Sequence, residues 1–334
     1  MQVLSCATSG APARAVGSSG MGRTNWTDVP ATLRGRIEEV LGGAVVSAAS
    51  QAAGWSPGSA DRVVTADGRR AFVKTISRGR NPDGFGMHRR EAAVMAQLPE
   101  GVQAPALVAV LDEPHDGDDW VALVLDDVEG RHPGSGADDA DTTAVLDALD
   151  TLPLVPAELS GLPRAPVELA PEFAAWDRLV DAGLPDPVPA HLAAAAPTFA
   201  EAARSAAAAV DGDHLVHLDC RADNLLVDRD GLVWVIDWPW AGVGAHWLDP
   251  LTYLLDALVR GEDTDVEQHL RTHRVFRDVR PGDVDAVLAG LAGLFLEKAT
   301  APPPPNMPTI RDFQLREGTV AGEWLLRRWD ARTT

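Results

Sequence analysis

The chain has 334 residues, of which 46% are hydrophobic and 23% are charged, as in an ordinary globular protein. This composition excludes collagen-like, coiled-coil and generally disordered chains. The formal net charge of −20 disfavours binding to nucleic acid phosphates or to anionic lipid, so we expect neither nucleic acid nor a membrane as partner.

Cysteine content and hydropathy narrow the class of protein further. Cys6 and Cys220 are too few for a disulfide framework or for a structural zinc site. No apolar run reaches the roughly 18 residues of a membrane span, and the first apolar stretch is too short for a signal peptide. We therefore expect a cytoplasmic protein, while the oligomeric state is left open by the sequence.

The first third of the chain predicts a small lobe rich in strands. Residues 1–24 are rich in Ala, Gly and Ser without periodicity and predict a disordered tail. Residues 25–128 alternate between apolar strands, turn residues and amphipathic helices. The expected elements are a helix at 30–41, strands at 45–49, 62–65 and 71–76, a helix at 87–98, and strands at 108–111 and 120–125.

The remainder of the chain predicts a larger helical lobe. The polar, Gly-rich segment 126–141 predicts a hinge or linker, and 129–334 is expected to form the second lobe. The expected helices lie at 141–149, 171–182, 191–210, 250–259, 265–276, 283–297 and 310–329, with a small β element at 211–237 and a polyproline connection at 302–305. The predicted fold class is therefore α+β with two lobes.

The densest group of polar residues precedes a predicted hairpin. Apolar runs at 225–227 and 232–236 flank a turn at 228–231, so that Asn224 and Asp237 are expected to face each other at its open end. Hard oxygen ligands of this kind suit Mg²⁺, which binds few carboxylates together with phosphate oxygens and water. Asp219 lies near enough in sequence to act on a hydroxyl held at that metal-bound phosphate. The alternative, that Asp219 and Asn224 are ordinary turn residues, is disfavoured by the hairpin and by Asp237.

A second pair of charged residues lies upstream, at inward-facing positions. Alternation places Lys74 on the apolar face of its strand, and helical spacing places Glu91 on one stripe with Met87 and Met95. Because unpaired buried charges are costly, we expect Lys74 and Glu91 to pair. Lys74 and Lys298 are the only lysines of the chain, which favours a need for an ammonium group at position 74. The alternative is that each charge reaches water at the edge of the core.

Taken together, these residues resemble the pattern of protein-kinase-like enzymes. Lys74 on a strand and Glu91 on the next helix are followed by His217-x-Asp219-x-x-x-x-Asn224 and then by Asp237 after a short hairpin. The sequence at 236–238 is Ile-Asp-Trp in place of Asp-Phe-Gly. With that variant the chain is similar to the aminoglycoside phosphotransferase family of small-molecule kinases, over about residues 35–330.

The resemblance implies a two-lobed, protein-kinase-like fold that uses ATP and Mg²⁺. Asp219 would be the base or orienting carboxylate for the substrate hydroxyl, with Arg221 near the γ-phosphate. Asn224 and Asp237 would hold the metal ions. Lys74, held by Glu91, would neutralise the α- and β-phosphates.

The same resemblance implies where the rest of the nucleotide would bind. The loop 53–59 would cover the phosphates, with backbone N–H groups near Ser56 facing them. In the hinge, the carbonyl of Asp126 and the N–H of Val128 would bind adenine. Asp249 precedes Pro250, which predicts that it caps a helix, and in the family this position braces the catalytic loop.

Departures from the family pattern limit what the resemblance implies about substrate. The loop 53–59 is not Gly-x-Gly-x-x-Gly, and Cys-Arg-Ala-Asp at 220–223 stands where the family often has a His-Pro-Gly run. No segment ending in Ala-Pro-Glu follows Asp237, which disfavours a protein substrate.

The expected activity is ATP- and Mg²⁺-dependent phosphorylation of a hydroxyl group of a small molecule, such as an aminoglycoside or another antibiotic. The acidic chain suits a cationic acceptor. One alternative is a metabolic kinase for an amino alcohol or a sugar, and another is a non-catalytic ATP-binding protein. A serine hydrolase, suggested by Gly-x-Ser-x-Gly around Ser56, is disfavoured because Pro57 lacks the N–H that an oxyanion hole needs.

Overall fold

The computed structural model describes residues 24–51, 58–134, 140–155, 161–182, 184, 188–304 and 307–333. The expected tail, apart from Thr24, and the loop residue Ser56 lie outside these residues. The described chain forms two compact units, residues 24–131 with 225–240 and residues 132–224 with 241–333. We call them the sheet unit and the helical unit.

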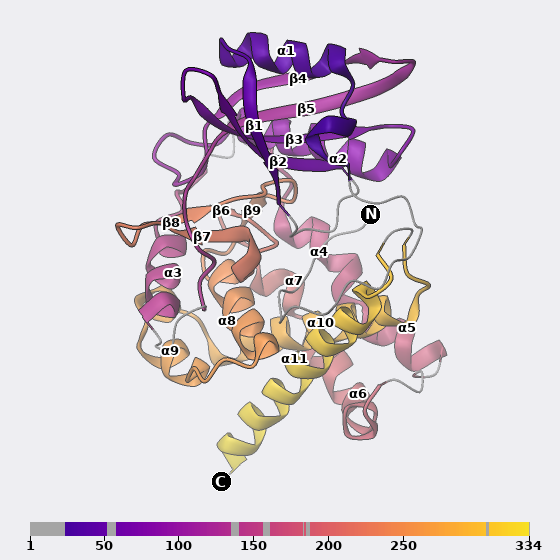
Figure 1. The fold of residues 1–334 in the computed structure, drawn as a ribbon. Helices are drawn as coiled ribbons and strands as arrows, with labels where there is room; N and C mark the ends of the chain where they lie inside the picture. The colour runs from indigo at the N-terminus through magenta and orange to yellow at the C-terminus, as the bar shows by residue number, and fades with distance from the viewer. Residues whose placement is uncertain are drawn as a thin grey trace. The chain divides into compact units, whose positions relative to one another are not determined.

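The sheet unit is built on a five-stranded antiparallel sheet with the order β1-β2-β3-β5-β4 (Figure 1). The strands are β1 (Val45–Ser50), β2 (Ser59–Thr65), β3 (Arg70–Ser77), β4 (Leu107–His115) and β5 (Asp118–Asp126). The strands predicted from alternation and turn residues are therefore present, each somewhat longer than expected. In the central pair, Lys74 of β3 lies opposite Leu123 of β5.

Helix α1 (Ala31–Leu41) follows a short 3₁₀ helix, η1 (Trp26–Asp28), and covers one face of the sheet. Leu33, Ile37 and Leu41 recur at helical spacing and are buried against strand residues such as Val73 and Val124. The helix ends at Gly42, whose φ of 79° is the left-handed conformation that glycine adopts at little cost. This confirms the expected helix.

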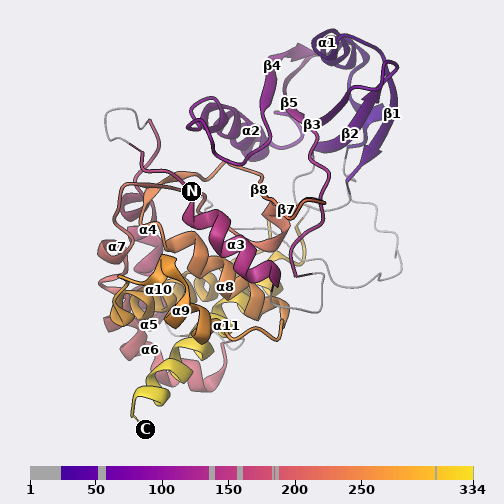
Figure 2. The ribbon, with the colours of Figure 1, turned by 90° about the vertical axis from the view of Figure 1, so that its left-hand side faces the viewer.

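Helix α2 (Pro82–Met95) packs on β3 and β5, on the face of the sheet away from α1 (Figure 2). It starts earlier than the predicted position 87, because the side chain of Asn81 accepts a hydrogen bond from the Gly84 N–H at 2.9 Å and Pro82 suits the first turn. It also ends before the expected Leu98, since Ala96 is the C-cap and Pro99 follows.

A hairpin from far along the sequence completes the sheet unit. Strands β7 (Leu225–Val227) and β8 (Val233–Val235) pair antiparallel, with Leu225 opposite Val235, as the turn at 228–231 predicts. The N–H of Val235 donates to the carbonyl of Gln103 at 2.9 Å. Arg131 and Val227 exchange two backbone hydrogen bonds, of 3.0 and 2.7 Å. The hairpin is thereby tied to the first part of the chain.

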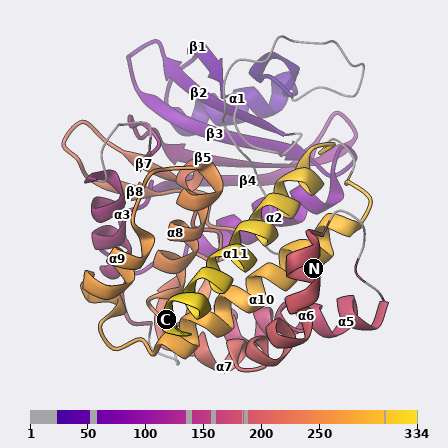
Figure 3. The same ribbon diagram turned by 90° about the horizontal axis from the view of Figure 1, so that it is seen from below.

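The helical unit contains the remaining helices and a small two-stranded sheet. The helices are α3 (Ala140–Asp150), α4 (Ala165–Phe173), α5 (Ala175–Ala182), α6 (Ala190–Ala203), α7 (Ala206–Ala209), η3 (Ala222–Asn224), α8 (Leu248–Arg260), α9 (Val266–Thr272), η4 (Arg274–Phe276), α10 (Pro281–Thr300) and α11 (Ile310–Thr333), and the strands are β6 (His214–Val216) and β9 (Gly242–Gly244). The two longest helices, α10 and α11, lie side by side (Figure 3). Close packing requires glycine at two positions of α10, because a Cβ would lie 2.4 Å from Phe173 at Gly290 and 2.6 Å from Trp176 at Gly293.

Three predicted helices of this unit differ from the observed ones. The helix expected at 171–182 is two helices, and Pro171 lies inside the first of them. The helix expected at 191–210 breaks after Ala203. The helix expected at 265–276 is interrupted at His273, whose backbone is extended with ψ at 138°. Among the helices that the structure describes, none combines the length and the hydropathy needed to span a bilayer.

Candidate active site

Lys74 joins two carboxylates in the sheet unit. Alternation along β3 turns Lys74 toward α2, where its Nζ donates to Glu91 Oε1 at 2.6 Å. It also donates to Asp237 Oδ1 at 2.8 Å. The side chain of Lys74 is 14% exposed and that of Glu91 3%, whereas Asp237 is 48% exposed. The expected pairing of Lys74 with Glu91 is confirmed, and the ammonium group is held at a fixed position by two anions.

The electrostatics of this cluster keep Lys74 charged. Burial alone would lower the pKa of Lys74, but the charges of Asp237 and Glu91 outweigh it and raise the pKa above its usual value. Burial raises the pKa of the Glu91 carboxyl, which the ammonium group of Lys74 partly offsets. His88, on the same helix as Glu91, has its pKa lowered to about 4 by burial and by Lys74, so it is neutral near pH 7.

Asp237 follows β8 in an unusual backbone conformation. Its φ is 66°, in the left-handed region, which Asp tolerates better than most residues. The next residue, Trp238, is fully buried, and its indole N–H donates to the Val235 carbonyl at 2.9 Å. Farther along, the guanidinium of Arg90 lies 5.2 Å from the ring centre of Trp240. The turn is thus anchored, and it directs the Asp237 carboxylate to Lys74.

The predicted hinge residues lie at the end of β5. Asp126 is the last residue of this strand, and its N–H donates to the Ala106 carbonyl at 3.0 Å. The carbonyl of Val128 accepts a hydrogen bond from Arg62 at 3.0 Å. The intervening carboxylate of Asp127 is buried against Arg62 and Arg70, at 3.2 and 2.6 Å. The backbone here is held firmly, through atoms other than the two proposed to bind adenine.

Asp219 and its neighbours form a second cluster, within the helical unit. Asp219 is buried, and its Oδ2 accepts a hydrogen bond from Asn224 Nδ2 at 3.0 Å. The same amide donates to the Asp219 carbonyl at 2.8 Å. Arg221 donates to Asp219 Oδ1 at 3.2 Å, so both carboxylate oxygens are oriented by neighbours in the loop. Asp219, Arg221 and Asn224 therefore lie together, as their sequence spacing predicts.

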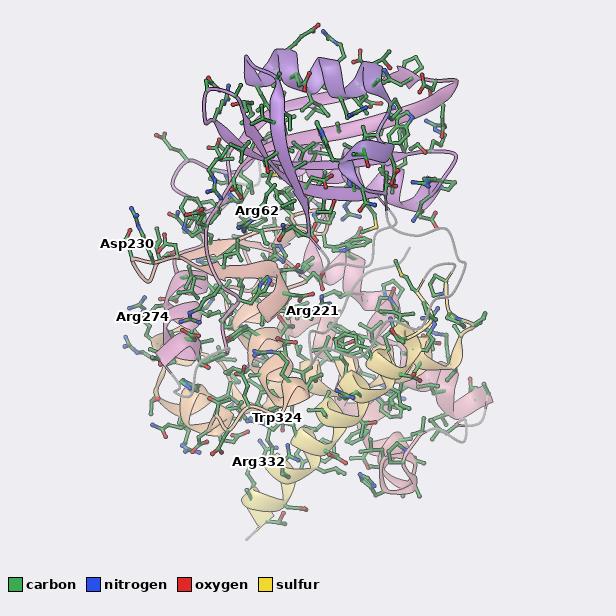
Figure 4. The ribbon with its side chains drawn as sticks, in the orientation of Figure 1. Arg62, Arg221, Asp230, Arg274, Trp324 and Arg332 are labelled. Atoms are coloured by element: carbon green, nitrogen blue, oxygen red, sulfur yellow. The ribbon has the colours of Figure 1, made fainter. Side chains whose placement is uncertain are left out.

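Arg221 is a buried cation surrounded by acids. It donates to both oxygens of Asp223, at 2.9 and 2.7 Å, in addition to its bond with Asp219. Burial alone would lower the pKa of Arg221, but the charges of Asp219 and Asp223 raise it, so the guanidinium stays protonated. Figure 4 labels Arg221 and shows its side chain beside the helices of this unit.

Two carboxylates of α8 hold the backbone of residues 217–224, the predicted catalytic loop. Asp249 accepts hydrogen bonds from the N–H groups of His217 at 2.5 Å and Leu218 at 2.9 Å. Two helical turns later on the same face, Asp256 accepts from the Ala222 N–H at 2.9 Å. The prediction that Asp249 caps its own helix is wrong: α8 begins at Leu248, and the carboxylate serves the loop instead of the helix end.

The comparison with protein families decides the class of this protein. Residues 53–283 match the model of the phosphotransferase enzyme family, which is more than half of the chain. The chain belongs to this family. The resemblance drawn from Lys74, Glu91, the Asp219 loop and Asp237 is thereby confirmed, and so is the expectation of an enzyme that transfers phosphoryl groups. A sequence search of curated proteins gives no match.

Solved structures share the fold of this phosphotransferase. One is a thermostable mutant of the aminoglycoside phosphotransferase APH(4)-Ia, with a TM-score of 0.56, 14% identity, and coverage of 88% of this chain and 98% of that one. Another is the spectinomycin phosphotransferase APH(9)-Ia in complex with ADP and spectinomycin, with a TM-score of 0.57, 12% identity, and coverage of 89% and 97%. The choline kinase LicA from Streptococcus pneumoniae has a TM-score of 0.54, 17% identity, and coverage of 89% and 98%. At these identities the likeness is one of fold, and it confirms the predicted α+β, kinase-like class.

Some residues around the site of the phosphotransferase were not predicted from its sequence. Asp223, Asp256 and His88 touch or surround the predicted site residues. Asp256 had a usable signal, since an acid seven residues after Asp249 on an otherwise apolar helix shares its face. Asp223 also had a local signal, since it lies two residues after Arg221, to which it binds. His88 had none, because its environment depends on Lys74 of a separate strand.

The metal site is one of the features of the phosphotransferase that stay predictions. Asn224 directly precedes β7 and Asp237 follows β8, but they belong to different units, so their convergence on one metal ion stays a prediction. Within the described residues, no group of three or more His, Cys, Asp or Glu side chains is arranged to hold a metal ion. Mg²⁺ bound partly through phosphate oxygens does not require such a group.

Proposed function

We propose that this phosphotransferase transfers the γ-phosphoryl group of ATP, with Mg²⁺, to a hydroxyl group of a small molecule. The observation that carries the proposal is the buried ammonium group of Lys74 between Glu91 and Asp237. A charged group that is fixed in place and largely removed from water is suited to neutralising the phosphates of a nucleotide. In this proposal Glu91 keeps Lys74 in position during the whole cycle.

The residues present fit the expected cofactors. Asp237 is half exposed, so its carboxylate reaches solvent while it contacts Lys74, as a ligand for an incoming metal–nucleotide complex must. We assign Asp237 and Asn224 as the protein ligands of Mg²⁺, with Ser56 and the backbone near it, and the hinge atoms of Asp126 and Val128, as nucleotide contacts. When bound, Mg²⁺ supplies charge neutralisation of the transferring phosphate.

We assign to Asp219 the role of acting on the hydroxyl group of the acceptor. Its Oδ1 and Oδ2 are oriented by Arg221 and Asn224, so the carboxylate presents a defined direction to an acceptor hydroxyl. As base or orienting group, Asp219 accepts the hydroxyl proton as the oxygen becomes a nucleophile. Arg221 is assigned to stabilise negative charge near this point. Positioning and charge neutralisation together supply what phosphoryl transfer requires.

The acceptor class that we favour is a molecule with amino groups, such as an aminoglycoside or another antibiotic. The net charge of −20 and the excess of acids around Arg221 favour a cationic molecule over an anionic one. Relatives of similar fold include a spectinomycin phosphotransferase and a choline kinase, which are named for an antibiotic and an amino alcohol. A metabolic kinase for an amino alcohol or a sugar is therefore the second candidate.

The experiment that tests the proposal is an ATP-consumption screen over aminoglycosides, macrolides, amino alcohols and sugars, with the Asp219→Asn protein as the blank. We expect one class to stimulate consumption and to yield a phosphorylated product by mass spectrometry, with no stimulation in the variant. Mg·ATP binding without transfer to any acceptor would support the non-catalytic alternative instead.

A further inference from the structure

A small cavity lies beside the loop at 217–224, within the helical unit. It has a volume of about 20 Å³, and its walls come from the loop and from α8, α10 and α11. The polar side chains in its lining are Asp219, Arg221, Thr252, Asp256 and Glu317, and the remaining walls are mainly apolar side chains of α8 and α10. A polar cavity of this size holds one water molecule, which needs two to four polar partners.

Glu317 is the residue in this lining whose bonding is incomplete. It is 6% exposed, and its Oε2 is buried without a hydrogen-bond partner. A buried carboxyl oxygen left in this state costs about 1–3 kcal/mol. The need for a partner holds in either protonation state, because a neutral carboxyl donates where a carboxylate accepts. Glu317 Oε2 therefore needs a hydrogen-bond partner, and a water molecule in the adjoining cavity would supply one.

Glu317 faces the catalytic loop together with a second residue of α11. Phe313, one helical turn earlier, places its ring 5.6 Å from the guanidinium of Arg221. Burial raises the pKa of the Glu317 carboxyl well above its ordinary value, and the nearby charge of Arg221 partly offsets this effect. Arg221 is therefore bound by Asp219 and Asp223 and is also contacted by Phe313 of α11.

Helix α11 itself is firmly anchored, so it places Glu317 reproducibly. Trp324, which is labelled in Figure 4, donates to Glu267 of α9 at 2.7 Å through its indole N–H. Arg328 donates to the same carboxylate at 2.7 Å and to Asp285 of α10 at 2.8 Å. These contacts fix the helix about two to three turns beyond Glu317, and they do not involve the catalytic loop.

We propose that Glu317 is a positioning residue for phosphoryl transfer, which holds the Arg221 guanidinium through one water molecule bound in this cavity. The water accepts from an Arg221 N–H and bonds to Glu317 Oε2. By fixing Arg221, Glu317 fixes the Asp219 carboxylate that Arg221 contacts. The catalytic consequence rests on the function proposed above for Asp219, whereas the effect on Arg221 does not.

Three variants separate positioning from a general effect on folding. Glu317→Met keeps the volume and removes the hydrogen-bonding group, and Glu317→Gln restores that group without the charge. Gln314→Met is the matched control, because Gln314 is a buried polar residue on the same helix that bonds to Arg311 and not to the loop. Thermal unfolding of all three proteins shows which of them fold.

The readouts are kcat and KM, and the Arg221 Nε–H signal in arginine-labelled protein, assigned with Arg221→Lys. For Glu317→Met we expect kcat to fall roughly ten- to a hundredfold, as expected for a displaced catalytic group, with KM for ATP changed less than about twofold. The Arg221 signal should shift and exchange faster with solvent. Glu317→Gln should restore most of kcat and of the wild-type Arg221 signal. Gln314→Met should change neither kcat nor this signal.

A crystal structure of the wild-type protein adds a direct check, in which we expect an ordered water within hydrogen-bonding distance of Glu317 Oε2 and Arg221. An empty cavity, or an Arg221 signal that is the same in wild type and Glu317→Met, would overturn the proposal. If no acceptor is phosphorylated, the proposed function fails, and the Arg221 signal still decides whether Glu317 positions it. If an acceptor is phosphorylated equally by wild type and Glu317→Met, the positioning role alone is wrong.

Discussion

The N–H of Leu218 donates to Asp249 Oδ1 at 2.9 Å, while Leu218 adopts a left-handed backbone conformation with φ at 63°. A bulky residue in this conformation costs about 1–3 kcal/mol and persists only where its surroundings hold it. Here the carboxylate of Asp249 in α8 stabilises this conformation of Leu218, which directly precedes Asp219. The direction of the Asp219 side chain therefore depends on Asp249, a residue to which we assign no part in the chemistry.

The first prediction concerns the pH dependence of this contact. Burial raises the pKa of Asp249 to about 6, from an ordinary 3.8, although the N–H groups of His217 and Leu218 act in the opposite direction. The folded protein therefore binds the proton more tightly than the unfolded chain. Protonated Asp249 therefore contributes about 3 kcal/mol to the free energy of unfolding. This contribution is fully present below about pH 4 and is lost as the pH rises through 6.

Asp249→Asn removes this titration, so the difference in free energy of unfolding between wild type and variant should shift in favour of the variant between pH 4 and 6. Urea unfolding at a series of pH values measures the difference, and other titrating groups cancel because both proteins carry them. A difference that does not change with pH, or that changes in the opposite direction, would contradict the assignment.

The second prediction uses the two lysines of the chain. Lys74→Arg keeps the charge, but a guanidinium does not fit where one nitrogen contacts Glu91 at 2.6 Å and Asp237 at 2.8 Å. We expect kcat/KM to fall by about a hundredfold or more, while the variant still folds with a cooperative thermal transition. Lys298→Arg is the control, since Lys298 pairs with Glu172 in the helical unit, at 3.5 Å. Equal activity of the two variants would refute the role given to Lys74.

The third prediction concerns the carboxylate assigned to the metal. Asp237→Asn removes an anionic oxygen from the Lys74 cluster, so we expect the affinity for Mg·ATP to fall about tenfold or more, with a smaller change for ATP in the presence of EDTA. Calorimetric titration measures both affinities. Asp230→Asn is the control, because Asp230 lies at the exposed turn of the same hairpin, with its side chain 77% exposed (Figure 4). A similar loss for both nucleotide forms would argue against metal binding at Asp237.

The fourth prediction concerns Asp219. Asp219→Asn preserves shape and the hydrogen bond to Arg221 in part, but it removes the group that accepts the hydroxyl proton. We expect kcat to fall by about 10²–10⁴ while the affinity for Mg·ATP stays within about threefold. Steady-state kinetics and nucleotide titration provide the two values. Asp213 is an exposed carboxylate before β6, so Asp213→Asn should leave both values unchanged. If Asp219→Asn lost only nucleotide binding, the role assigned to Asp219 would be contradicted.

Local patterns in the sequence were sufficient for much of the fold. The spacing of Leu33, Ile37 and Leu41 determined α1, because a helix needs only one apolar stripe to bury. Alternation determined that Lys74 faces the same side of the sheet as α2, since the side chains of a strand have period two. Asn81 and Pro82 were an equally local signal for the start of α2, but a prediction based on apolar spacing alone misses it.

The candidate site was predictable in its parts. The pairing of Lys74 with Glu91 followed from the cost of burying either charge alone, and the grouping of Asp219 with Asn224 followed from short chain distance. By contrast, the contact of Asp256 with the Ala222 N–H joins residues 34 positions apart. No local pattern encodes such a contact, because the loop and the helix meet only after both have packed.

Most helices and strands, the two charged groupings and the enzyme family could be predicted from short stretches of the sequence, because helix and strand periods, turn residues and closely spaced motifs are local properties of the chain. Tertiary structure alone decided that the hairpin at 225–240 packs with the sheet unit, so that Asp237 meets Lys74 from a point 163 residues away. It also decided that Glu317 faces the catalytic loop from the last helix. Such contacts depend on how whole elements bury their apolar faces together, and that is a property of the packed chain.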